Sequence, residues 1–416
     1  MTTSKAACHR RSDCRLCGSG KLDLVLGLAA TPPANAFVPA GRLDEEQARF
    51  PLDVFQCRDC GHVQLLDVVD PEILFADYVY VSGTSPVFVR HFEDYAAKVM
   101  TGYAPPEGAL AFDIGSNDGT LLGFFQKAGM KVLGVDPARA IAADATARGI
   151  ETLNDFFTAD LARKIRDERG PAHVITANNV FAHADDLGGI ADGIAALLHD
   201  DGVFAFEVSY LLDVYEGTLF DTIYHEHVAY HTVAPLIGFF HRHGLELVAA
   251  ERIGTHGGSL RGYVRKPGRF PVENSVGELI ALEKAAGLDD PETLKAFGAK
   301  IEAVGAELRR IISDARAQGR RIAAFGAPAK ATTLMYQFGL EPADIEFIID
   351  DSPLKQGLYS PGKHIPVLPA SAIAEKKPDD LVLLAWNFAD SIMDKHRAFC
   401  DEGGRFIIPL PTIRIV

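Results

Sequence analysis

Four cysteines stand in two pairs with the spacing of a metal site. Cys14 and Cys17 form one Cys-x2-Cys pair, and Cys57 and Cys60 form the other. Two such pairs can place four thiolates around one zinc ion. The stretch between the pairs, residues 18–56, is longer than usual, but a loop insertion costs little closure entropy. A redox pair and four unrelated thiols are the alternatives, and the doubled spacing favours zinc. Because four thiolates leave no open position for water, we predict a structural site.

A second motif joins an acidic strand end to a glycine-containing turn. Residues 111–120 read AFDIGSNDGT, which predicts a strand ending near Asp113, a turn and a helix. Gly115 and Gly119 permit close backbone approach, and Asn117 tolerates the left-handed conformation. The acidic strand end would repel the pyrophosphate of a dinucleotide but suits an ammonium and a sulfonium. The glycines also do not follow the G-x-G-x-x-G pattern of dinucleotide-binding proteins. The motif resembles motif I of class I S-adenosylmethionine (SAM) methyltransferases.

Later residues fall where such a fold contacts the rest of the cofactor. Asp136 ends a second expected strand, at about the 20-residue distance of an acidic residue that receives ribose hydroxyls. Asp155 can accept from the adenine amino group and Phe156 can cover the ring, with a plain polar turn as the alternative for both. Asn178 closes the fourth strand at the carboxyl edge of the sheet. We therefore predict a SAM site along this edge.

Tyr, His and Glu side chains are concentrated in one short segment, Tyr224-His225-Glu226-His227. Acid–base groups lie here beyond a strand end, at a spacing that differs from H-E-x-x-H zinc sites. Single Tyr and His residues are usually structural. Their concentration in the domain that binds a methyl donor favours a catalytic role.

Two further segments are candidates for substrate contacts. One is a strand followed by a turn of small residues at Gly326 and a helix start at Lys330, which can hold a phosphate. It has neither a P-loop nor the dinucleotide glycines, so a substrate nucleotide or pyrophosphate is preferred over NAD. The other is the Gly-rich turn between His256 and Arg261. An α/β domain without any ligand is the alternative for the C-terminal segment.

The elements that must position these residues alternate between short apolar strands and helical stretches. From about Ala109 the runs ALAFDIG, KVLGVD, HVITANNV and GVFAFEV indicate a parallel sheet with helices on its faces. An amphipathic helix begins at Pro291, and strand–helix alternation then resumes. The first 75 or so residues look irregular. We predict an α/β protein with a zinc-binding module over residues 1–75, a Rossmann-like class I methyltransferase domain over 76–285 and a second Rossmann-like α/β domain over 286–416.

Composition narrows the classes of partner. The chain has 416 residues, of which 48% are hydrophobic and 23% charged, as in ordinary globular proteins. Its 41 Lys and Arg against 56 Asp and Glu give a net charge of −15, which suits neither nucleic acid nor an anionic membrane. The N-terminus lacks the apolar core of a signal peptide, and no stretch approaches the roughly 18 apolar residues of a membrane span. We expect a cytoplasmic monomer with neither kind of partner.

Together the motifs resemble those of a known family. The cysteine pairs, FDIGSNDGTLL, NNVFAHADD, YHEH, HGGSLR and a C-terminal FGAPAKATT…IDDSPLKQG…PGKHIPV resemble, in order and over nearly the whole chain, the deoxysugar C-methyltransferases of antibiotic biosynthesis. The resemblance implies a zinc-containing enzyme that uses SAM to methylate a nucleotide-linked 4-ketosugar, with dTDP as the expected nucleotide. The family's active-site residues fall on Tyr78, His183, Tyr224, Glu226 and His227.

The reaction itself suggests what these residues do. A carbon next to a ketone becomes nucleophilic when a base removes its proton and the enolate oxygen is stabilised. We predict that His227 is the base, directly or through one water, and that Glu226 orients a histidine or the substrate. Tyr224 and Tyr78 would donate hydrogen bonds to the keto oxygen, and His183 would position the sugar. We expect methylation at carbon 3. Spacing alone leaves open an exchange of roles between His225 and His227.

Two rival functions make different sequence predictions. A zinc-containing methyltransferase acting on RNA would carry a basic face and an N/D-P-P-[YF] motif, which this chain lacks; action on another small molecule is the remaining form of that rival. A non-catalytic SAM- or nucleotide-sugar-binding regulator would not need Tyr, Glu and His together in one segment. Both are less favoured than a C-methyltransferase.

Overall fold

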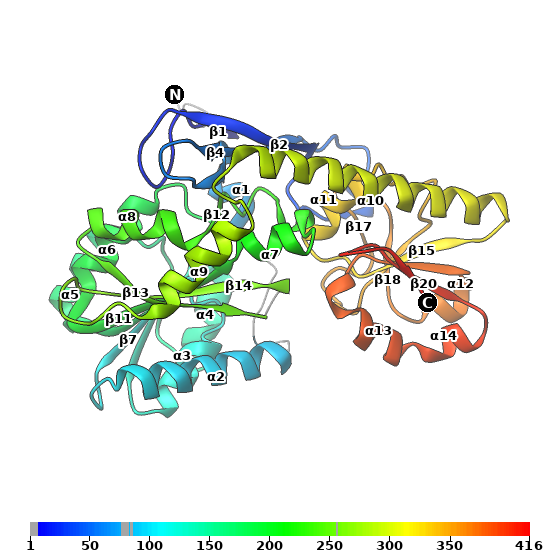
Figure 1. Ribbon diagram of the computed structural model, residues 1–416. Coiled ribbons are helices and arrows are strands. Elements are labelled where there is room, and N and C mark those ends of the chain that lie inside the picture. The colour runs from blue at the N-terminus through cyan, green and yellow to red at the C-terminus, as the bar shows by residue number, and fades with distance from the viewer. Residues whose placement is uncertain (1–6, 76–82, 84–85, 255–256) are drawn as a thin grey trace, which may run out of the picture.

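The computed structural model describes residues 7–75, 83, 86–254 and 257–416, and Figure 1 shows three regions along the chain. The N-terminal strands lie above a central α/β region, and a C-terminal α/β region lies beside it. Tyr78 and His256, for which we expected roles, lie outside the described residues. Among the described residues, no helix has both the length and the apolar character needed to cross a lipid bilayer.

The N-terminal region is built on an antiparallel sheet with the strand order β12-β5-β4-β2. Our expectation of an irregular chain here is wrong. Register shifts between Leu24 and Leu26 and between Leu28 and Thr31 interrupt the alternation by which a strand is recognised. The elements are β1 (Cys8–Arg10), β2 (Leu22–Thr31), β3 (Val38–Pro39), η1 (Ala40–Arg42), β4 (Phe50–Cys57), β5 (Val63–Leu65), β6 (Asp67–Val69) and α1 (Pro71–Phe75).

One strand of this N-terminal sheet comes from the central region. β12 (Ala229–Tyr230) pairs antiparallel with β5, with Ala229 opposite Gln64 and Tyr230 opposite Val63. The strand follows the Tyr224–His227 segment almost directly. The candidate catalytic segment is therefore attached to the sheet that carries the cysteines.

The central region contains a seven-stranded sheet in the order β13-β14-β11-β10-β7-β8-β9. The five strands from β11 to β9 are parallel, whereas β14 pairs antiparallel with both β11 and the edge strand β13. The strands are β7 (Leu110–Ile114), β8 (Lys131–Val135), β9 (Thr152–Leu153), β10 (Ala172–Asn178), β11 (Leu198–Ser209), β13 (Glu246–Ile253) and β14 (Ser259–Arg265). The helices are α2 (Pro86–Tyr103), α3 (Thr120–Lys127), α4 (Arg139–Ala147), α5 (Ala159–Arg169), α6 (Leu187–Leu197), α7 (Leu211–Glu216), α8 (Val233–Arg242) and α9 (Asn274–Ala285), with the short η3 (Phe220–Thr222).

The strands of this sheet are buried on both faces, as their almost continuous apolar sequences predict. Phe112 of β7 belongs to the large core that also contains Ile165 of α5, while its neighbour Ala111 belongs to a second core with Phe125 of α3. Successive residues of the strand therefore face opposite helical layers. The loops at the carboxyl edge are left as the place for ligands.

The C-terminal region has a second sheet, in the order β18-β16-β15-β19-β20-β21, which is parallel except for β21. From β15 the strand order runs through β16 to β18 on one side and through β19 to β20 on the other. The topological switch point, where the order reverses, therefore lies at β15. The strands are β15 (Ile322–Phe325), β16 (Ile348–Ile349), β17 (Leu358–Tyr359), β18 (Val367–Leu368), β19 (Asp380–Leu383), β20 (Arg405–Ile408) and β21 (Arg414–Ile415). The helices are α11 (Lys330–Gln337), α12 (Ala372–Lys376), η5 (Trp386–Phe388), α13 (Ala389–Lys395) and α14 (Arg397–Asp401). The predicted fold class is confirmed.

A long helix and a strand pair are two of the connections that join the C-terminal region to the others. α10 (Pro291–Ala317) begins at Pro291, is capped by the Asp290 side chain and runs beside β2 towards the C-terminal sheet (Figure 1). Its Phe297 ring lies 5.5 Å from that of Tyr215 in the central region. The second connection is a two-residue antiparallel pairing between β3 and β17. Hydrogen bonds from Asn35 to Glu226 and from Thr333 of α11 to Ile223 bring all three regions to the segment that contains Tyr224–His227.

Candidate active site and cofactor sites

The four cysteines converge, as their spacing predicts. Their Sγ atoms all lie within 4.8 Å of one another. The Sγ atoms of Cys14 and Cys60 are 3.6 Å apart, and those of Cys17 and Cys57 are 3.5 Å apart. Zn–S bonds of about 2.3 Å in a tetrahedron place sulfurs about 3.8 Å apart, so these residues fit zinc. All four ligand positions are filled by thiolates, which fits a structural role.

The turn after β7 has the backbone that its sequence predicts. Gly115, Asn117 and Gly119 all have positive φ, at +67°, +50° and +75°. A Cβ atom at Gly115 would lie 2.4 Å from a methyl of Val180, and one at Gly119 would lie 2.7 Å from Ile150. Larger residues would therefore clash here as well as strain the backbone. The turn leads directly into α3, whose N-cap is Gly119.

Two buried carboxylates lie beneath this turn. Asp113 accepts a 2.6 Å hydrogen bond from the hydroxyl of Thr176. Burial raises the pKa of Asp113 to about 7, opposed by the Thr176 bond and assisted by the charge of Asp136. Asp136 accepts from the backbone N–H groups of Asn117 at 2.9 Å and Ala138 at 2.8 Å, and burial raises its pKa as well. The second carboxylate thus holds the turn, and the first supplies negative charge behind it.

Further along the same edge, polar groups and an exposed ring are positioned for a ligand. Both side-chain amide atoms of Asn178 are buried and have no hydrogen-bond partner within the described part of the chain. Phe156 is 46% exposed, whereas the next residue, Phe157, packs on Phe112. The Asp155 carboxylate accepts from the Phe156 N–H at 2.8 Å. An unpaired buried amide is costly unless a ligand satisfies it. The edge therefore fits SAM.

Three aromatic side chains with acid–base character are brought together beyond this edge. The ring centroid of His227 lies 4.1 Å from that of Tyr224 and 4.9 Å from that of His183. The backbone of Val228 donates to the carbonyl of Ala182 at 3.0 Å, which ties the two segments together. Burial lowers the pKa of His183 well below its ordinary value, and the neighbouring His227 lowers it further. The described part of the chain thus unites three of the five residues predicted for catalysis.

One hydrogen bond determines which nitrogen of His227 can act as a base. Nδ1 of His227 lies 2.8 Å from the carbonyl oxygen of Thr222. A carbonyl only accepts, so Nδ1 carries the proton in the neutral ring. The lone pair is then on Nε2, which is the nitrogen that can take a proton.

His225 faces away from this cluster, towards the N-terminal region. Its side chain is buried, and its Nε2 donates to the carbonyl of Phe50 at 3.1 Å. Its ring also meets the Phe50 ring edge-on, with centroids 5.7 Å apart. Burial lowers the pKa of His225 to about 4, opposed by its backbone hydrogen bonds. The two histidines that spacing left interchangeable are therefore in different surroundings.

The buried carboxylate of Glu226 has a partner that sequence reasoning missed. Its Oε1 accepts a 2.8 Å hydrogen bond from the side-chain amide of Asn35. Asn35 belongs to the loop between β2 and β3 and is separated from Glu226 by 191 positions. Its sequence surroundings, TPPANAF, indicate only a proline-containing turn. The N-terminal region thus contributes a side chain to the candidate active site.

The turn of the C-terminal sheet lies close to η3, which precedes the candidate catalytic segment. A Cβ atom at Gly326 would lie only 2.3 Å from that of Ala385, so the carboxyl ends of β15 and β19 are in close contact. Lys330 places its ammonium 3.4 Å from the ring centroid of Trp386, whose indole N–H donates to Asp221 at 2.6 Å. Burial lowers the pKa of Lys330 to about 8, opposed by the charge of Asp221. Lys330 therefore lies at the junction between the two α/β regions.

A second lysine, also missed from the sequence, approaches the same turn. Lys355 donates to the carbonyl of Ala327 at 2.7 Å. Burial lowers its pKa, opposed by the charge of Asp350. Oδ1 of Asn387, beyond β19, is buried and has no hydrogen-bond partner among the residues that the structure describes. Positive charge and an unsatisfied polar atom thus lie together at this edge.

Arg261, predicted to contact substrate, lies in a buried ion pair of the central sheet. Its guanidinium donates to Glu207 at 2.8 Å and stacks over the Tyr95 ring at 3.9 Å. Burial opposes ionisation of Glu207, but the His91 hydrogen bond and the Arg261 charge outweigh it and lower the Glu207 pKa to about 2. Glu207 is the sheet neighbour of Asn178. Arg261 therefore lies next to the predicted cofactor edge, where it is paired with Glu207 and Tyr95, and not in the cluster of His183, Tyr224 and His227.

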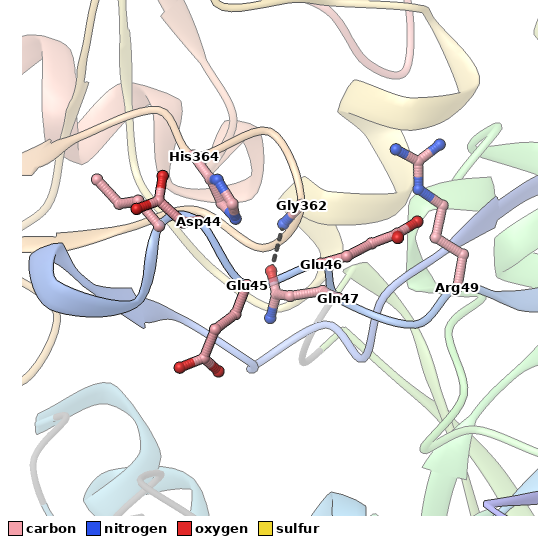
Figure 2. Close-up of a pocket in the computed structure, with 8 residues that line it drawn as sticks. Asp44, Glu45, Glu46, Gln47, Arg49, Gly362 and His364 are labelled. Carbon is pink, nitrogen blue, oxygen red and sulfur yellow. Dashed lines mark hydrogen bonds between the residues drawn. The ribbon is translucent and has the colours of Figure 1, made fainter.

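A surface pocket of about 190 Å³ lies between the N-terminal and C-terminal regions (Figure 2). It contains none of the predicted site residues. Gln47 spans it and accepts from the backbone N–H of Gly362 at 2.6 Å. Three acidic side chains make it a poor site for an anionic nucleotide. Its lining residues are Leu43, Asp44, Glu45, Glu46, Gln47, Arg49, Gly362 and His364.

Comparisons with known proteins cover most of the chain. Family models match a zinc binding domain over residues 14–75, a methyltransferase domain over residues 90–250 and a C-methyltransferase C-terminal domain over residues 254–411. The C-methyltransferase NovU of Streptomyces niveus is 35% identical over 409 residues, which cover 97% of this chain and 96% of that protein.

Solved structures show weaker likenesses. The PH0226 protein of Pyrococcus horikoshii OT3 is 14% identical with a TM-score of 0.36, and the match covers 45% of this chain and 94% of that one. Magnesium protoporphyrin IX methyltransferase of Synechocystis PCC 6803, solved with bound SAM, is 14% identical with a TM-score of 0.33, covering 43% and 79% of the two chains. These two values are too low to bear on function.

Proposed function

Because this chain belongs to the C-methyltransferase family that includes NovU of Streptomyces niveus, we propose that its acceptor is a nucleotide-linked 4-keto deoxysugar. As a member, the protein is a SAM-dependent C-methyltransferase with a structural zinc site at its four cysteines. The proposed nucleotide is dTDP, the proposed methylated carbon is carbon 3, next to the keto group, and the proposed setting is antibiotic biosynthesis.

The observation that carries this proposal is the surroundings of His227. The Thr222 carbonyl keeps Nδ1 protonated, and Tyr224 and His183 lie against the same ring. Nε2 of His227 takes the proton from the carbon next to the ketone, and the C–H bonding electrons form the enolate. The Tyr224 hydroxyl donates to the enolate oxygen, which is where the charge develops. Tyr78 is proposed as a second donor and His183 as a sugar contact.

The methyl donor and the acceptor are held by different regions. SAM, when bound, supplies an electrophilic methyl group that leaves its sulfur for the enolate carbon. In our proposal the turn from Asp113 to Gly119 and the Asp136 carboxylate hold the donor, and the ring cluster holds the sugar. Transfer then depends mainly on the alignment of carbon, methyl and sulfur, which binding supplies.

The nucleotide is proposed to bind at the carboxyl edge of the C-terminal sheet. Support comes from the switch point at β15, from Lys330 and Lys355 near the turn at Gly326, and from the unsatisfied Oδ1 of Asn387. A diphosphate bound there would pair with the ammonium groups of Lys330 and Lys355, whose positive charges are costly to bury without a partner. Since Lys330 also faces Asp221, just before the catalytic segment, a sugar attached to this diphosphate can extend towards His227.

The test is incubation with a panel of nucleotide 4-ketosugars and labelled SAM, and without SAM in deuterated water. We expect methylation of a 4-ketosugar, deuterium uptake next to the ketone, and a fall in kcat of roughly 100- to 10,000-fold in His227→Asn. His243→Asn is the matched control, because His243 also bonds through Nδ1, to Asp192 on the surface. Nuclear magnetic resonance of the product identifies the carbon. Full turnover by His227→Asn, or methylation of RNA in place of a sugar, would refute the proposal.

A further inference from the structure

The loop between β2 and β3 connects the zinc-binding region to the candidate catalytic carboxylate. Asn35, near the middle of this loop, donates its side-chain amide to Oε1 of Glu226 at 2.8 Å. Building on the proposed function, we propose that Asn35 is a positioning residue of the methyl-transfer reaction. Its amide holds the Glu226 carboxylate in the orientation that catalysis requires, so the zinc-binding region forms part of the active site.

The loop is anchored on both sides of Asn35. β2 ends at Thr31, which is paired with Phe50 of β4, and β3 is paired with β17 of the C-terminal region. Pro32 and Pro33 restrict the backbone between these anchors. A side chain on a loop that is fixed at both ends loses little further entropy when it makes its hydrogen bond.

Side chains from elsewhere hold the backbone next to Asn35. The hydroxyl of Thr332 on α11 donates to the carbonyl of Ala34 at 3.2 Å. The amide of Gln47 donates to the carbonyl of Ala36 at 2.8 Å. The two neighbours of Asn35 are therefore tied to α11 and to the N-terminal region respectively. The neighbouring Thr333 of α11 donates to the carbonyl of Ile223, at the start of the catalytic segment, at 2.8 Å. One helix thus holds both the loop and the segment that the loop contacts.

Glu226 is placed so that its orientation matters to its neighbours. Its side chain is buried, and it lies between His225, which is fixed to Phe50, and His227, whose ring contacts Tyr224. A buried carboxylate oxygen that loses its donor pays a desolvation cost or turns towards another partner. Either outcome would move the carboxylate relative to the neighbouring His227, whose ring lies in the cluster with Tyr224 and His183. An amide is suited to this position because it donates without bringing a second charge.

The first experiment measures steady-state kinetics of Asn35→Ala. We expect kcat to fall roughly 10- to 150-fold, the range for a hydrogen bond to a charged group, with little change in the KM for the sugar nucleotide or in SAM affinity. Ser19→Ala is the matched control, because Ser19 also donates to a carboxylate of this region, Asp59, but on the surface. Zinc content is measured for each variant to verify that the cysteine site is intact.

The second experiment uses Asn35→Asp and a pH profile, which a purely structural role would not move. Two facing carboxylates share one proton, so the variant regains a donor towards Glu226 only as the pH falls. We expect the ratio of variant to wild-type kcat to rise as the pH decreases. The titratable groups around the site, His183, His225, His227, Asp221 and Lys330, are present in both proteins, so the ratio removes the titration that the two proteins share. The ratio is obtained even if Asn35→Ala fails to fold.

Glu226→Gln separates failure of this inference from failure of the proposed function. If Glu226→Gln turns over at the wild-type rate, the carboxylate is not needed and the positioning role of Asn35 is refuted, while the proposed function, which rests on His227, stands. If Glu226→Gln is impaired while Asn35→Ala keeps the wild-type kcat, the positioning role of Asn35 is refuted. A ratio for Asn35→Asp that stays constant with pH also refutes it.

Discussion

The two α/β regions of this protein share a scaffold but differ in the charge that they gather at its edge. In the central sheet, β7 leads through Gly115 into α3 with Asp113 and Asp136 beneath the turn. In the C-terminal sheet, β15 leads through Gly326 towards α11 with Lys330 and Lys355 nearby. An acidic edge suits a sulfonium-bearing cofactor, and a basic edge suits a diphosphate. The two regions therefore have a similar strand–turn–helix scaffold but gather charge of opposite sign at it.

Removing the zinc should have the largest effect, because the N-terminal region that holds the zinc is paired with both α/β regions, through β12 and through β17. A structural zinc contributes folding free energy on the order of 10 kcal/mol to a small metal-binding region. Chelation, or Cys57→Ser, should release about one zinc per chain and abolish turnover, because a small metal-binding region unfolds without its metal and would release the loop that holds Asn35. SAM binding to the central sheet should remain, as measured by calorimetry. Full activity in zinc-free protein would contradict this expectation.

Asp136→Ala should affect the central edge alone. Loss of the carboxylate removes the acceptor for Asn117 N–H and a group that faces the ribose hydroxyls in the proposed complex. We expect SAM affinity to fall roughly 10- to 150-fold, the range for hydrogen bonds to a charged group, with sugar-nucleotide affinity unchanged. Asp144→Ala, which removes a carboxylate from the exposed face of α4, is the control. Equal SAM affinity in Asp136→Ala and the wild type would remove this residue from the cofactor site.

Lys330→Met should affect the C-terminal edge alone. Methionine keeps the apolar stem next to Trp386 but removes the charge. We expect the KM for the sugar nucleotide to rise about 10-fold, the lower end of the range for charged hydrogen bonds, while SAM affinity stays the same. Lys376→Met is the control, since this lysine also lies over an aromatic ring, that of Phe347, in the same region. An unchanged KM in Lys330→Met would show that the diphosphate binds elsewhere.

The smallest effect should be an opposite dependence on pH at the two edges. Burial raises the pKa of Asp113 to about 7, so its negative charge appears as the pH rises through that value and SAM should bind a few-fold more tightly. Burial lowers the pKa of Lys330 to about 8, so its positive charge is lost as the pH rises further and the sugar nucleotide should bind a few-fold more weakly. Calorimetric titration of each ligand between pH 6 and about 9 tests this. If both affinities rise or both fall with pH, the proposed contrast in charge between the two sheet edges is wrong.

Sequence reasoning worked where the chemistry is local in the chain. The cysteine spacing predicts a metal cluster, and Gly115, Asn117 and Gly119 predict a turn that requires positive φ. Both inferences depend on residues a few positions apart, and both correspond to geometry in the structure. In the central sheet the alternation of strands and helices was likewise recognisable, because inner strands such as β7 and β10 are buried on both faces and are therefore almost continuously apolar.

Sequence reasoning fell short where partners are distant. His225 and His227 differ because one meets the carbonyl of Phe50, 175 positions away, and the other meets that of Thr222, five positions away. Backbone carbonyls have no signature in a sequence. Asn35 could not be connected with Glu226 across 191 positions. Lys330 was recognised as a charge near a turn, but its place beside Trp386 and Asp221 depends on how the two regions pack.

The pairing of β12 with β5 has a consequence for how the protein is made. All four cysteines have been synthesised by residue 60, whereas Ala229 and Tyr230, which cover Gln64 and Val63, follow much later. At about 5–20 residues per second, the ribosome delivers them roughly 10–30 s after β5. During that interval the nascent chain can already hold zinc, but the edge of its first sheet is open to any other strand. β12, which covers that edge, follows the candidate catalytic segment almost directly, so the nascent N-terminal region is exposed to mispairing until residues 224–230 have been translated.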